Sequence, residues 1–586
     1  MCFKKGLIFS VFLLLIPIIA ETEVIDNRDS RREYARSVSQ LGMPDYSVSS
    51  EPRLRKKGQS PITLVLFRSS EGIPEFGEYA PSTLVFGPHG CSTAAYADKE
   101  AAMETIEYLR SLPGIIYAEL DGEVYANDSV IDSTDGKQEA IGLQHSFHSY
   151  GASEMGFEQA VTWCKETGMD SLTVAVIDSG VYPHPFLKDR LEISGFDYVD
   201  GDEDSTNDIF GHGTHVAGIV VDCTPELPVF ICPIRILDSS GKGSIANTTS
   251  AIFEAAESGC AVINLSLTAK QHSEALEDAV KFALNHGTSV VIAAGNNGDD
   301  SKGYCPVHLE DDGLIVVGSC VGSINAPVRA SYSNYGSCVD VFAFGTLIQS
   351  CALSEKYMTM TGTSQAAPHV SALCALLRGI FPSITCEEIE SRVKTLSGSG
   401  SVNIPNVASL VPRTIGVRGE VIYLPVGTQI ELLSTALPET SFIDISWRCD
   451  DARIATVNES NKLTCLEEGV TILRGEGSTN MRVSVELHVI ASDSVCRLPS
   501  SLTSIEAEAF AGTAIKAVYL PTNIRNLERS VFAQNDLKTF FYSGSNMLFK
   551  DMSDLNSNIC IVTDRHKDLW EGFENEGMNY LISCGE

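Results

Sequence analysis

The stretch from Leu172 to Gly345 constrains the fold most, because short β-branched apolar runs alternate there with segments of helical periodicity. The runs with the composition of buried strands are 173–177, 229–236, 262–265, 289–293 and 314–317. The clearest helices between them are expected at 247–258 and 274–286. Repeated units of this kind predict a parallel sheet with helices on both faces. Active sites in such α/β folds lie at the carboxyl ends of the strands.

The segments on either side of this region have other compositions. Residues 61–126 contain a strand, a helix with apolar positions at Ala102, Ile106 and Leu109, and a second short strand, which predicts a small α+β unit. Residues 127–143 are polar and acidic, as in an exposed and cleavable linker.

The amino-acid composition and pattern of the C-terminal part change twice along the chain. Residues 412–492 are rich in Val and Thr in short alternating runs, which predicts a small β-sandwich. From Leu498 a repeat begins, in which Phe510 recurs as Phe532, so the period is 22 residues. That is the length of a leucine-rich-type repeat. Two copies make a short solenoid at most, so residues 493–586 are expected to pack on their neighbours.

The N-terminus has the form of a secretory signal. Lys4 and Lys5 precede an uncharged apolar run from Gly6 to Ala20. This pattern predicts a signal peptide over 1–20, a polar leader over 21–60, and export. Ile18 is bulky for a cleavage motif that ends at Ala20, so an uncleaved anchor stays open as the alternative.

The charge balance argues against one class of partner. The chain has 42 basic and 76 acidic residues, a net charge of −34, whereas nucleic-acid binding needs a basic surface. The ordinary consequence is solubility, and weak calcium binding is the alternative.

The 17 cysteines lack zinc-type C-x-x-C spacing, so no metal framework is expected. In an exported protein, pairs such as Cys223 with Cys232 or Cys449 with Cys465 could form disulfides, but the sequence does not define connectivity.

Three segments carry candidate chemistry. Asp178 ends the first strand, where a carboxylate can accept an imidazole N–H and stabilise the imidazolium. His212 lies between glycines at a loop-to-helix junction and is the candidate general base, whereas His215 is expected to be structural. Ser364 begins an apolar helix, with its hydroxyl at the positive end. Taken singly, the aspartate could cap a turn, the histidines could bind metal, and the serine could be an N-cap.

Because the three motifs occur in the order aspartate, histidine, serine, the chain resembles the subtilisin-like serine proteases. The resemblance implies a catalytic triad of Asp178, His212 and Ser364. It also implies that Asn296, in Ala-Ala-Gly-Asn-Asn-Gly, joins the Ser364 N–H in an oxyanion hole. The implied fold is a subtilisin-like sheet over 144–411.

The resemblance further implies how partners bind. Residues 61–126 look like the family's inhibitory propeptide, which is cut away after folding. Protein or peptide substrates would lie as an extended strand between two edges, which correspond here to Gly241, Lys242, Gly243, Ser266, Leu267 and Thr268. Thr268 stands where many relatives have glycine, which affects the shape of the first specificity pocket.

The chain departs from the family at its tight calcium site. That site needs an aspartate after a His-Pro pair and a long loop after the histidine helix. Here Phe186 follows the pair, and only Val221 to Val229 separates the helix from the next strand. The site is therefore expected to be absent, and no cofactor or metal is required. For the acidic loop 200–204, the sequence is compatible with a weak cation site and with a solvated loop.

The C-terminal segments resemble parts of bacterial surface proteins. Residues 412–492 are similar to Ig-like domains through Trp447-Arg-Cys and Ala455-Thr-Val, and residues 493–586 resemble leucine-rich repeats of surface antigens. These likenesses imply a cell-surface or matrix ligand.

The sequence as a whole predicts a secreted serine endopeptidase, made as a precursor that processes itself. The alternative is a catalytically idle adhesin, against which the full set of triad and oxyanion residues argues.

Overall fold

The computed structural model describes residues 63–126 and 149–582 apart from short gaps, which are 87, 193–194, 413–416, 419–420, 479–480, 506–509, 511, 525, 528–536, 543–559 and 564–578. The expected signal, leader and linker (1–20, 21–60 and 127–143) lie outside the described residues. The chain divides into two compact units. The first contains the helix and strands up to Asp121, and the second contains every helix and strand from Glu123 onward.

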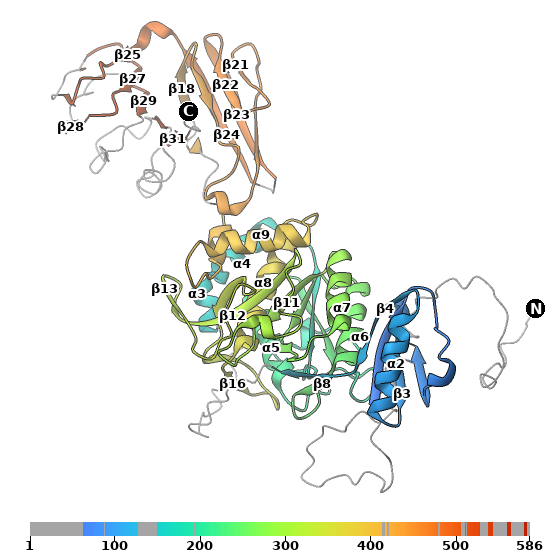
Figure 1. The fold of residues 1–586 in the computed structure, drawn as a ribbon. Helices are drawn as coiled ribbons and strands as arrows, with labels where there is room; N and C mark the ends of the chain where they lie inside the picture. Colours follow the sequence, from blue (N-terminus) through green and yellow to red (C-terminus); the bar gives the residue numbers. More distant parts are fainter. Residues whose placement is uncertain are drawn as a thin grey trace, which may run out of the picture. The chain divides into compact units, whose positions relative to one another are not determined.

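The first unit is an antiparallel sheet with one helix, drawn in blue in Figure 1. Its strands pair in the order β2-β3-β1-β4, with bounds β1 Thr63–Ser69, β2 Thr83–Phe86, β3 Cys91–Tyr96 and β4 Ile115–Leu120. Helix α2 (Lys99–Ser111) begins at its N-cap Asp98, whose carboxylate accepts the Ala101 N–H. Its expected apolar positions 102, 106 and 109 are buried. The strand, helix and strand expected from the sequence are all present.

A seven-stranded sheet is the centre of the second unit. Its order is β13-β12-β11-β9-β6-β7, and β14 pairs with β12. The bounds are β6 Leu172–Asp178, β7 Val229–Arg235, β9 Val262–Leu265, β11 Ser289–Ala293, β12 Leu314–Ser323, β13 Ala326–Arg329 and β14 Val341–Phe344. All neighbours are parallel except β12 and β13, which form a hairpin. The predicted α/β class and its parallel strands are confirmed.

Helices cover the sheet, and the longest of them is almost wholly buried. Helix α8 packs against β9, β11, β12 and β14, and also against α5. Figure 1 shows α6 and α7 on one side of the sheet and α4 and α8 on the other. The bounds are α3 Tyr150–Met155, α4 Phe157–Thr167, α5 His212–Cys223, α6 Ile245–Glu257, α7 Glu274–Asn285, α8 Thr363–Ile380 and α9 Cys386–Ser397. Among the described residues, no helix has the length and apolar character needed to cross a membrane.

Two small sheets follow the region of the central sheet in the chain. The larger has the order β18-β24-β23-β20 and the smaller β19-β22-β21. Their bounds are β18 Val421–Pro425, β19 Gln429–Glu431, β20 Ile445–Cys449, β21 Ala455–Val457, β22 Lys462–Cys465, β23 Gly469–Gly477 and β24 Arg482–Ile490. Trp447 is buried, and its indole N–H donates to the Leu433 carbonyl at 2.7 Å. The alternating Val and Thr runs of the sequence therefore do form short strands.

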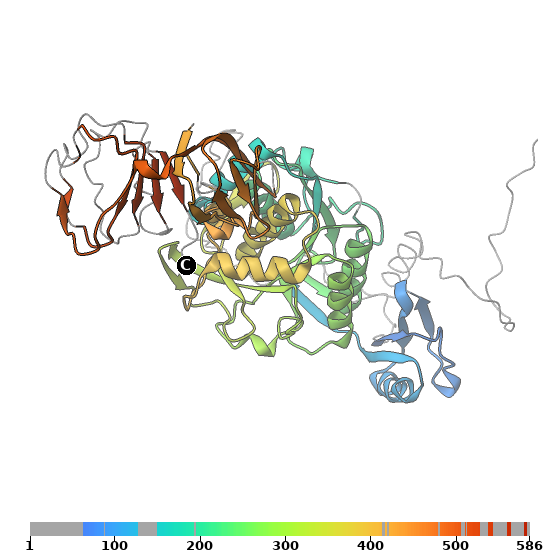
Figure 2. The ribbon, with the colours of Figure 1, turned by 90° about the horizontal axis from the view of Figure 1, so that it is seen from above.

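The last sheet is a ladder of parallel strands, seen at the red end of the chain in Figure 2. In order along the chain these are β25 Val495–Arg497, β27 Ala517–Leu520, β29 Thr539–Tyr542, β30 Cys560–Thr563 and β31 Asn579–Ile582. Val495 pairs with Ala517 and Ala517 with Thr539, two steps of 22 residues, and the next two steps are 21 and 19 residues. The ladder is longer than the two copies expected from the sequence.

The ladder packs on its neighbour, although it is longer than the two copies from which the sequence analysis inferred such packing. The hydroxyl of Thr539 donates to the Tyr423 carbonyl of β18 at 2.5 Å. Strand β17 (Val417–Arg418) precedes the two small sheets in the chain but pairs antiparallel with β31, at the end of the ladder.

Candidate active site

The aspartate of the site lies at the carboxyl end of a central strand. Asp178 is the last residue of β6, between β7 and β9, and its side chain is fully buried. The Ser179 N–H donates to Asp178 Oδ1 at 2.7 Å. The β-branched run before Asp178 forms the strand, so the sheet itself fixes where this carboxylate lies.

His212 is the first residue of α5 and faces that carboxylate. Its Nδ1 lies 2.9 Å from both Asp178 oxygens, and the side chain is 1% exposed. Since a carboxylate only accepts, Nδ1 carries the hydrogen, and Nε2 is the nitrogen that can take a proton. This is the arrangement that orients an imidazole as a general base.

A buried aspartate that the sequence reasoning missed holds the start of α5. Asp208 accepts the Gly211 N–H at 2.7 Å, and it also accepts the Thr214 N–H and hydroxyl at 3.1 and 2.5 Å. Gly211 is the N-cap of α5 and has no side chain to do this. Burial raises the pKa of Asp208, and the hydrogen bonds it accepts oppose that rise. Asp208 therefore positions His212 indirectly, because it holds the residues on either side of His212 at the start of α5.

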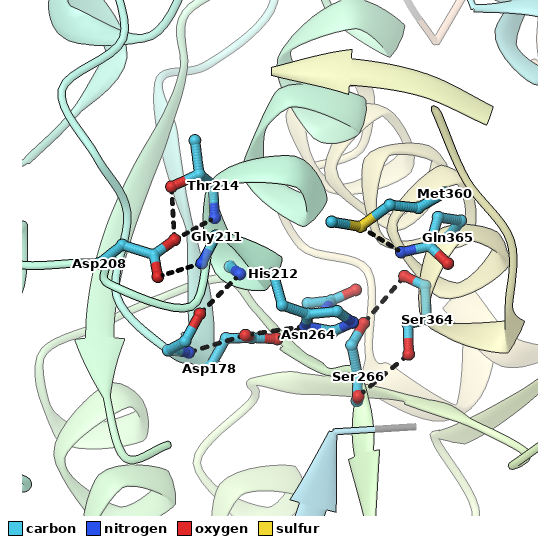
Figure 3. A network of polar contacts seen from close by, with 12 residues as sticks. Asp178, Asp208, Gly211, His212, Thr214, Asn264, Ser266, Met360, Ser364 and Gln365 are labelled. Atoms are coloured by element: carbon cyan, nitrogen blue, oxygen red, sulfur yellow. Dashed lines mark hydrogen bonds and ion pairs between the residues drawn. The ribbon is translucent and has the colours of Figure 1, made fainter. Parts of the chain in front are cut away.

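Ser364 lies at the other end of the site, near the start of α8. The N-cap of α8 is Gly362, so Ser364 is inside the first turn and is not an N-cap. Its hydroxyl donates to the Ser266 carbonyl at 3.2 Å, and the Ser266 hydroxyl donates to the Ser364 carbonyl at 3.0 Å. This pair of bonds joins Ser364 to Ser266, which belongs to one predicted substrate edge, as Figure 3 shows.

Two further buried side chains support Ser266. The Asn264 amide donates to the Ser266 hydroxyl at 3.0 Å, and the Ser371 hydroxyl donates to Asn264 Oδ1 at 2.8 Å. Asn264 is in β9 and Ser371 in α8, so the chain of bonds runs from the helix to the strand and back to Ser364. Nothing in the local sequence marks these residues as part of the site.

Asn296 is held in one orientation by Thr363. Its Oδ1 accepts the Thr363 N–H at 2.8 Å and the Thr363 hydroxyl at 3.0 Å. The amide oxygen is therefore directed to Thr363, so the NH₂ end of the side chain points the other way. Asn297 is exposed, and its backbone N–H donates to Asn334 Oδ1. Of the two asparagines, Asn296 is the one fixed against the Ser364 helix.

The two predicted substrate edges are strands β8 (Lys242–Ser244) and β10 (Leu267–Thr268), and both face a third strand. That strand is β5 (Glu123–Ala126), which lies between them in the order β10-β5-β8, antiparallel to each. The Ala126 N–H donates to the Gly241 carbonyl at 2.9 Å. The structure thus places five of the six predicted edge residues against a strand of the chain itself, and the sixth, Ser266, is hydrogen-bonded to Ser364.

The side chains of β5 alternate between burial and exposure. Val124 is fully buried and Ala126 is 3% exposed, whereas Tyr125 between them is 36% exposed. A Cβ at Gly243 would lie 2.5 Å from the Ile236 carbonyl oxygen and 3.2 Å from Val124. Glycine is needed there because the backbone of β8 approaches its neighbours too closely for a side chain.

The second histidine of the motif is structural, in agreement with the expectation from the sequence. His215 is buried, and its Nε2 donates to the carbonyls of Ile348 and Met358 at 3.1 and 3.2 Å. These residues belong to the hairpin of β15 (Ile348–Cys351) and β16 (Tyr357–Met360). Desolvation by burial lowers the pKa of His215 to about 3. The ring is neutral at physiological pH and links α5 to the hairpin.

His215 and His369 predict that the protein loses stability in mild acid. Burial also lowers the pKa of His369, to about 4. Both pKa values are depressed below that of an unfolded histidine, so below about pH 6.5 the unfolded chain takes up protons that the folded one does not. Each histidine should cost about 1.4 kcal/mol of unfolding free energy per pH unit from pH 6.5 towards its folded pKa.

Urea unfolding at several pH values, done on an inactive variant to prevent autolysis, measures this slope. His369→Asn should reduce the slope of unfolding free energy against pH by the contribution of one histidine, about 1.4 kcal/mol per pH unit. An unchanged slope in that variant would contradict the assignment of His369 as a neutral buried group.

The cysteines whose side chains the structure describes are thiols. Cys223, Cys232, Cys449 and Cys465 are in no disulfide, so neither of the two example pairs forms. Cys223 is in α5, and burial raises its pKa well above the ordinary value. Such thiols behave as small apolar side chains of the core.

The comparisons with known proteins agree with one another on the family that this chain resembles. A sequence model of the subtilase family matches residues 170–408. The thermophilic serine proteinase of Bacillus sp. (strain AK1) is 41% identical over 251 residues, which are 41% of this chain and 60% of that protein. Alkaline serine exoprotease A of Vibrio alginolyticus is 32% identical over 305 residues, 51% of this chain and 54% of that protein.

A third relative is covered almost completely. Thermitase of Thermoactinomyces vulgaris is 34% identical over 267 residues, which are 44% of this chain and 92% of that protein. The chain thus spans 60% and 54% of the length of the first two relatives and nearly all of the third.

Proposed function

We propose, from the premise that this chain belongs to the subtilase family, that it is an endopeptidase that hydrolyses peptide bonds through an acyl-enzyme on Ser364. Residues 170–408 are its subtilisin-like serine endopeptidase domain. The Asp178–His212 contact, the position of Ser364 beside Ser266 and the orientation of Asn296 support this mechanism.

In the proposed reaction, Ser364 Oγ attacks the substrate carbonyl while His212 Nε2 takes its proton. The C–N bond then breaks, and His212 returns that proton to the leaving amine. Water attacks the acyl-enzyme by the same route, with His212 again as base. Asp178 keeps His212 Nδ1–H in place and stabilises the imidazolium. The Ser364 N–H and the Asn296 amide bind the oxyanion of each tetrahedral intermediate.

The observation that carries the proposal is the strand β5 between β8 and β10. Endopeptidases of this kind bind substrate by main-chain β-pairing, and residues 123–126 pair in that manner. Ala126 lies opposite Leu267, the neighbour of Ser266, whose carbonyl accepts the nucleophile's hydroxyl. The chain's own segment lies between the two proposed substrate edges, which supports the inhibitory role of residues 61–126 and a self-cleavage soon after Ala126.

Sequencing the N-terminus of the processed protein tests this. We expect it to begin between Ala126 and His145, near the start of that interval, because β5 leads towards Ser364. A processed and active protein that still carries residues 61–126 covalently attached would contradict the proposal.

We further propose that the protein is exported and acts outside the cell. The basic residues and the apolar run at its N-terminus support this. We propose no requirement for calcium, in line with Phe186 and with the five residues that join α5 to β7.

The C-terminal sheets are proposed to bind a surface or matrix ligand and so to raise the local concentration of enzyme. Binding of the inactive full chain to cells or matrix should exceed that of a folded chain ended near Pro412. Equal binding by the full and the shortened chain would contradict this role of the C-terminal sheets.

A further inference from the structure

A cluster of potential metal ligands lies apart from the catalytic residues. His272, Glu277 and Cys305 offer ligand atoms that all lie within 4.8 Å of one another. His308 joins them, with its Nε2 3.1 Å from Glu277 Oε1. Two imidazoles, one thiol and one carboxylate are the ligand types that suit zinc, whereas calcium and magnesium prefer sets made only of oxygen.

The distances around Glu277 can be compared with those of a zinc site. His272 Nδ1 is 2.8 Å from the same Glu277 oxygen that His308 contacts, and the two imidazole rings have centroids 5.5 Å apart. Zinc bonds of about 2.0–2.3 Å place ligand atoms roughly 3.3–3.8 Å from one another. The atoms of His272, Glu277 and Cys305 already lie within 4.8 Å of one another, and a movement of the His308 ring, which contacts Glu277, would complete a set of four ligands.

The hydrogen bonds of His308 direct the correct nitrogen to the cluster. His308 Nδ1 lies 3.1 Å from the Tyr304 carbonyl, which can only accept, so Nδ1 carries a hydrogen. In the neutral ring, Nε2 then has the lone pair, and it faces the Glu277 carboxylate. Two acceptors in contact need a proton or a cation between them. A histidine whose other N–H donates to a backbone carbonyl is the usual form of a metal-bound histidine.

The backbone brings the ligands together from two segments. His272 precedes Ser273, the N-cap of α7, and Glu277 is in the first turn of that helix. Cys305 is joined to Ala269 by backbone hydrogen bonds of 2.9 and 3.0 Å, and its sulfur is 3.6 Å from the Ser273 carbonyl.

The four side chains of the cluster differ in exposure, and the His308 side chain is 27% exposed. Cys305 is 1% exposed, and the Glu277 side chain is 16% exposed. The His272 side chain is 63% exposed, so an ion can enter from that side.

We propose that His272, Glu277, Cys305 and His308 form a zinc-binding site. Because Ala269 directly follows Thr268 of β10, the ion links the segment after a substrate edge to the loop at 304–308. Zinc thereby stabilises the wall of the groove and takes no part in the acyl transfer. Sequence spacing did not indicate this site, since its two segments meet only through the Ala269–Cys305 pairing.

Metal binding is measured on the full-length Ser364→Ala chain, so the result does not depend on peptidase activity. After treatment with chelator and dialysis, titration with zinc should give one equivalent bound, and the bound ion should raise the melting temperature. Cobalt(II) should give the near-ultraviolet band of a thiolate ligand. Cys305→Ala should abolish that band, and both Cys305→Ala and His308→Ala should weaken zinc binding at least 100-fold.

Matched controls are His286→Ala, at the other end of α7, and Cys449→Ala, in the C-terminal sheets, which should bind as the parent does. His272→Ala is the variant least able to disturb folding, because its side chain is mostly exposed, and it too should weaken binding. The proposal is overturned if the parent binds no stoichiometric zinc. It is also overturned if the cluster variants bind as well as the controls, or if cobalt shows no thiolate band.

Discussion

Replacing Ser364 by alanine should abolish peptide hydrolysis and leave the precursor uncut. The hydroxyl is the only proposed nucleophile, and the oxyanion donors and groove alone give little rate. The loss expected is on the order of 10⁶-fold in kcat, the size known for subtilisin itself, a member of the same family. Hydrolysis of a small chromogenic peptide, labelling by an organophosphorus reagent and the length of the purified chain are the three readouts.

Thr385→Ala is a matched control for the simple loss of a hydroxyl at a helix start. Thr385 is a true N-cap, with a reciprocal capping box to Glu388 on α9. Its loss should cost about 1 kcal/mol of stability and leave hydrolysis unchanged. Labelling of the Ser364→Ala protein at a different serine, together with retained activity, would disprove the assignment of the nucleophile.

Asn296→Ala should lower kcat by about 100- to 1,000-fold with a much smaller change in KM, the range found for this type of donor in subtilisin. The reason is that the amide binds charge that exists in the transition state and not in the bound substrate. Thr363→Val should lower kcat less, because it removes one of the two hydrogen bonds that orient Asn296 but keeps the backbone N–H. Thr363→Ser should retain most of the activity.

Asn297→Ala provides the comparison, since the neighbouring side chain is exposed. Its steady-state parameters should match those of the parent. If Asn297→Ala lost more activity than Asn296→Ala, the oxyanion donor would have to be reassigned.

The parts of the fold that sequence could predict are those with a local physical signal. Runs such as 173–177 and 289–293 are too apolar and β-branched for a half-exposed strand, and they form β6 and β11 of the central sheet. Ser364 was expected at the start of a helix, and α8 begins one residue earlier. The hydrophobic pattern and the chemistry of helix ends depend on neighbouring residues, so they can be predicted from a single sequence.

The parts that sequence missed depend on pairs of residues far apart in the chain. Asn264 and Ser371 are ordinary polar residues until β9 and α8 pack together. Asp208 lies four residues before His212 in an acidic loop, where many aspartates are only solvated. An aspartate three residues before a glycine N-cap is a weak local signal that could have identified it.

The repeat was undercounted for a related reason. The first two copies share a Leu-Pro pair and a Phe-Ala motif, whereas the segments before the later strands β30 and β31 contain neither pair. Their strands still join the ladder, because pairing needs extended apolar residues at the right interval and not an identical turn.

The pairing of β17 with β31 also has a consequence for biosynthesis. Val417 pairs with Leu581, 164 residues later in the chain, so this contact closes a very long loop. Contacts of such long range form slowly, and this one cannot form before Leu581 has left the ribosome. The catalytic sheet, whose last strand in the chain is β14, can be complete well before that point. During synthesis, the edge of β30 that will receive β31 is unpaired and open to association with other chains. The synthesis of β31 therefore determines when the unpaired edge of β30 is covered and can no longer associate with other chains.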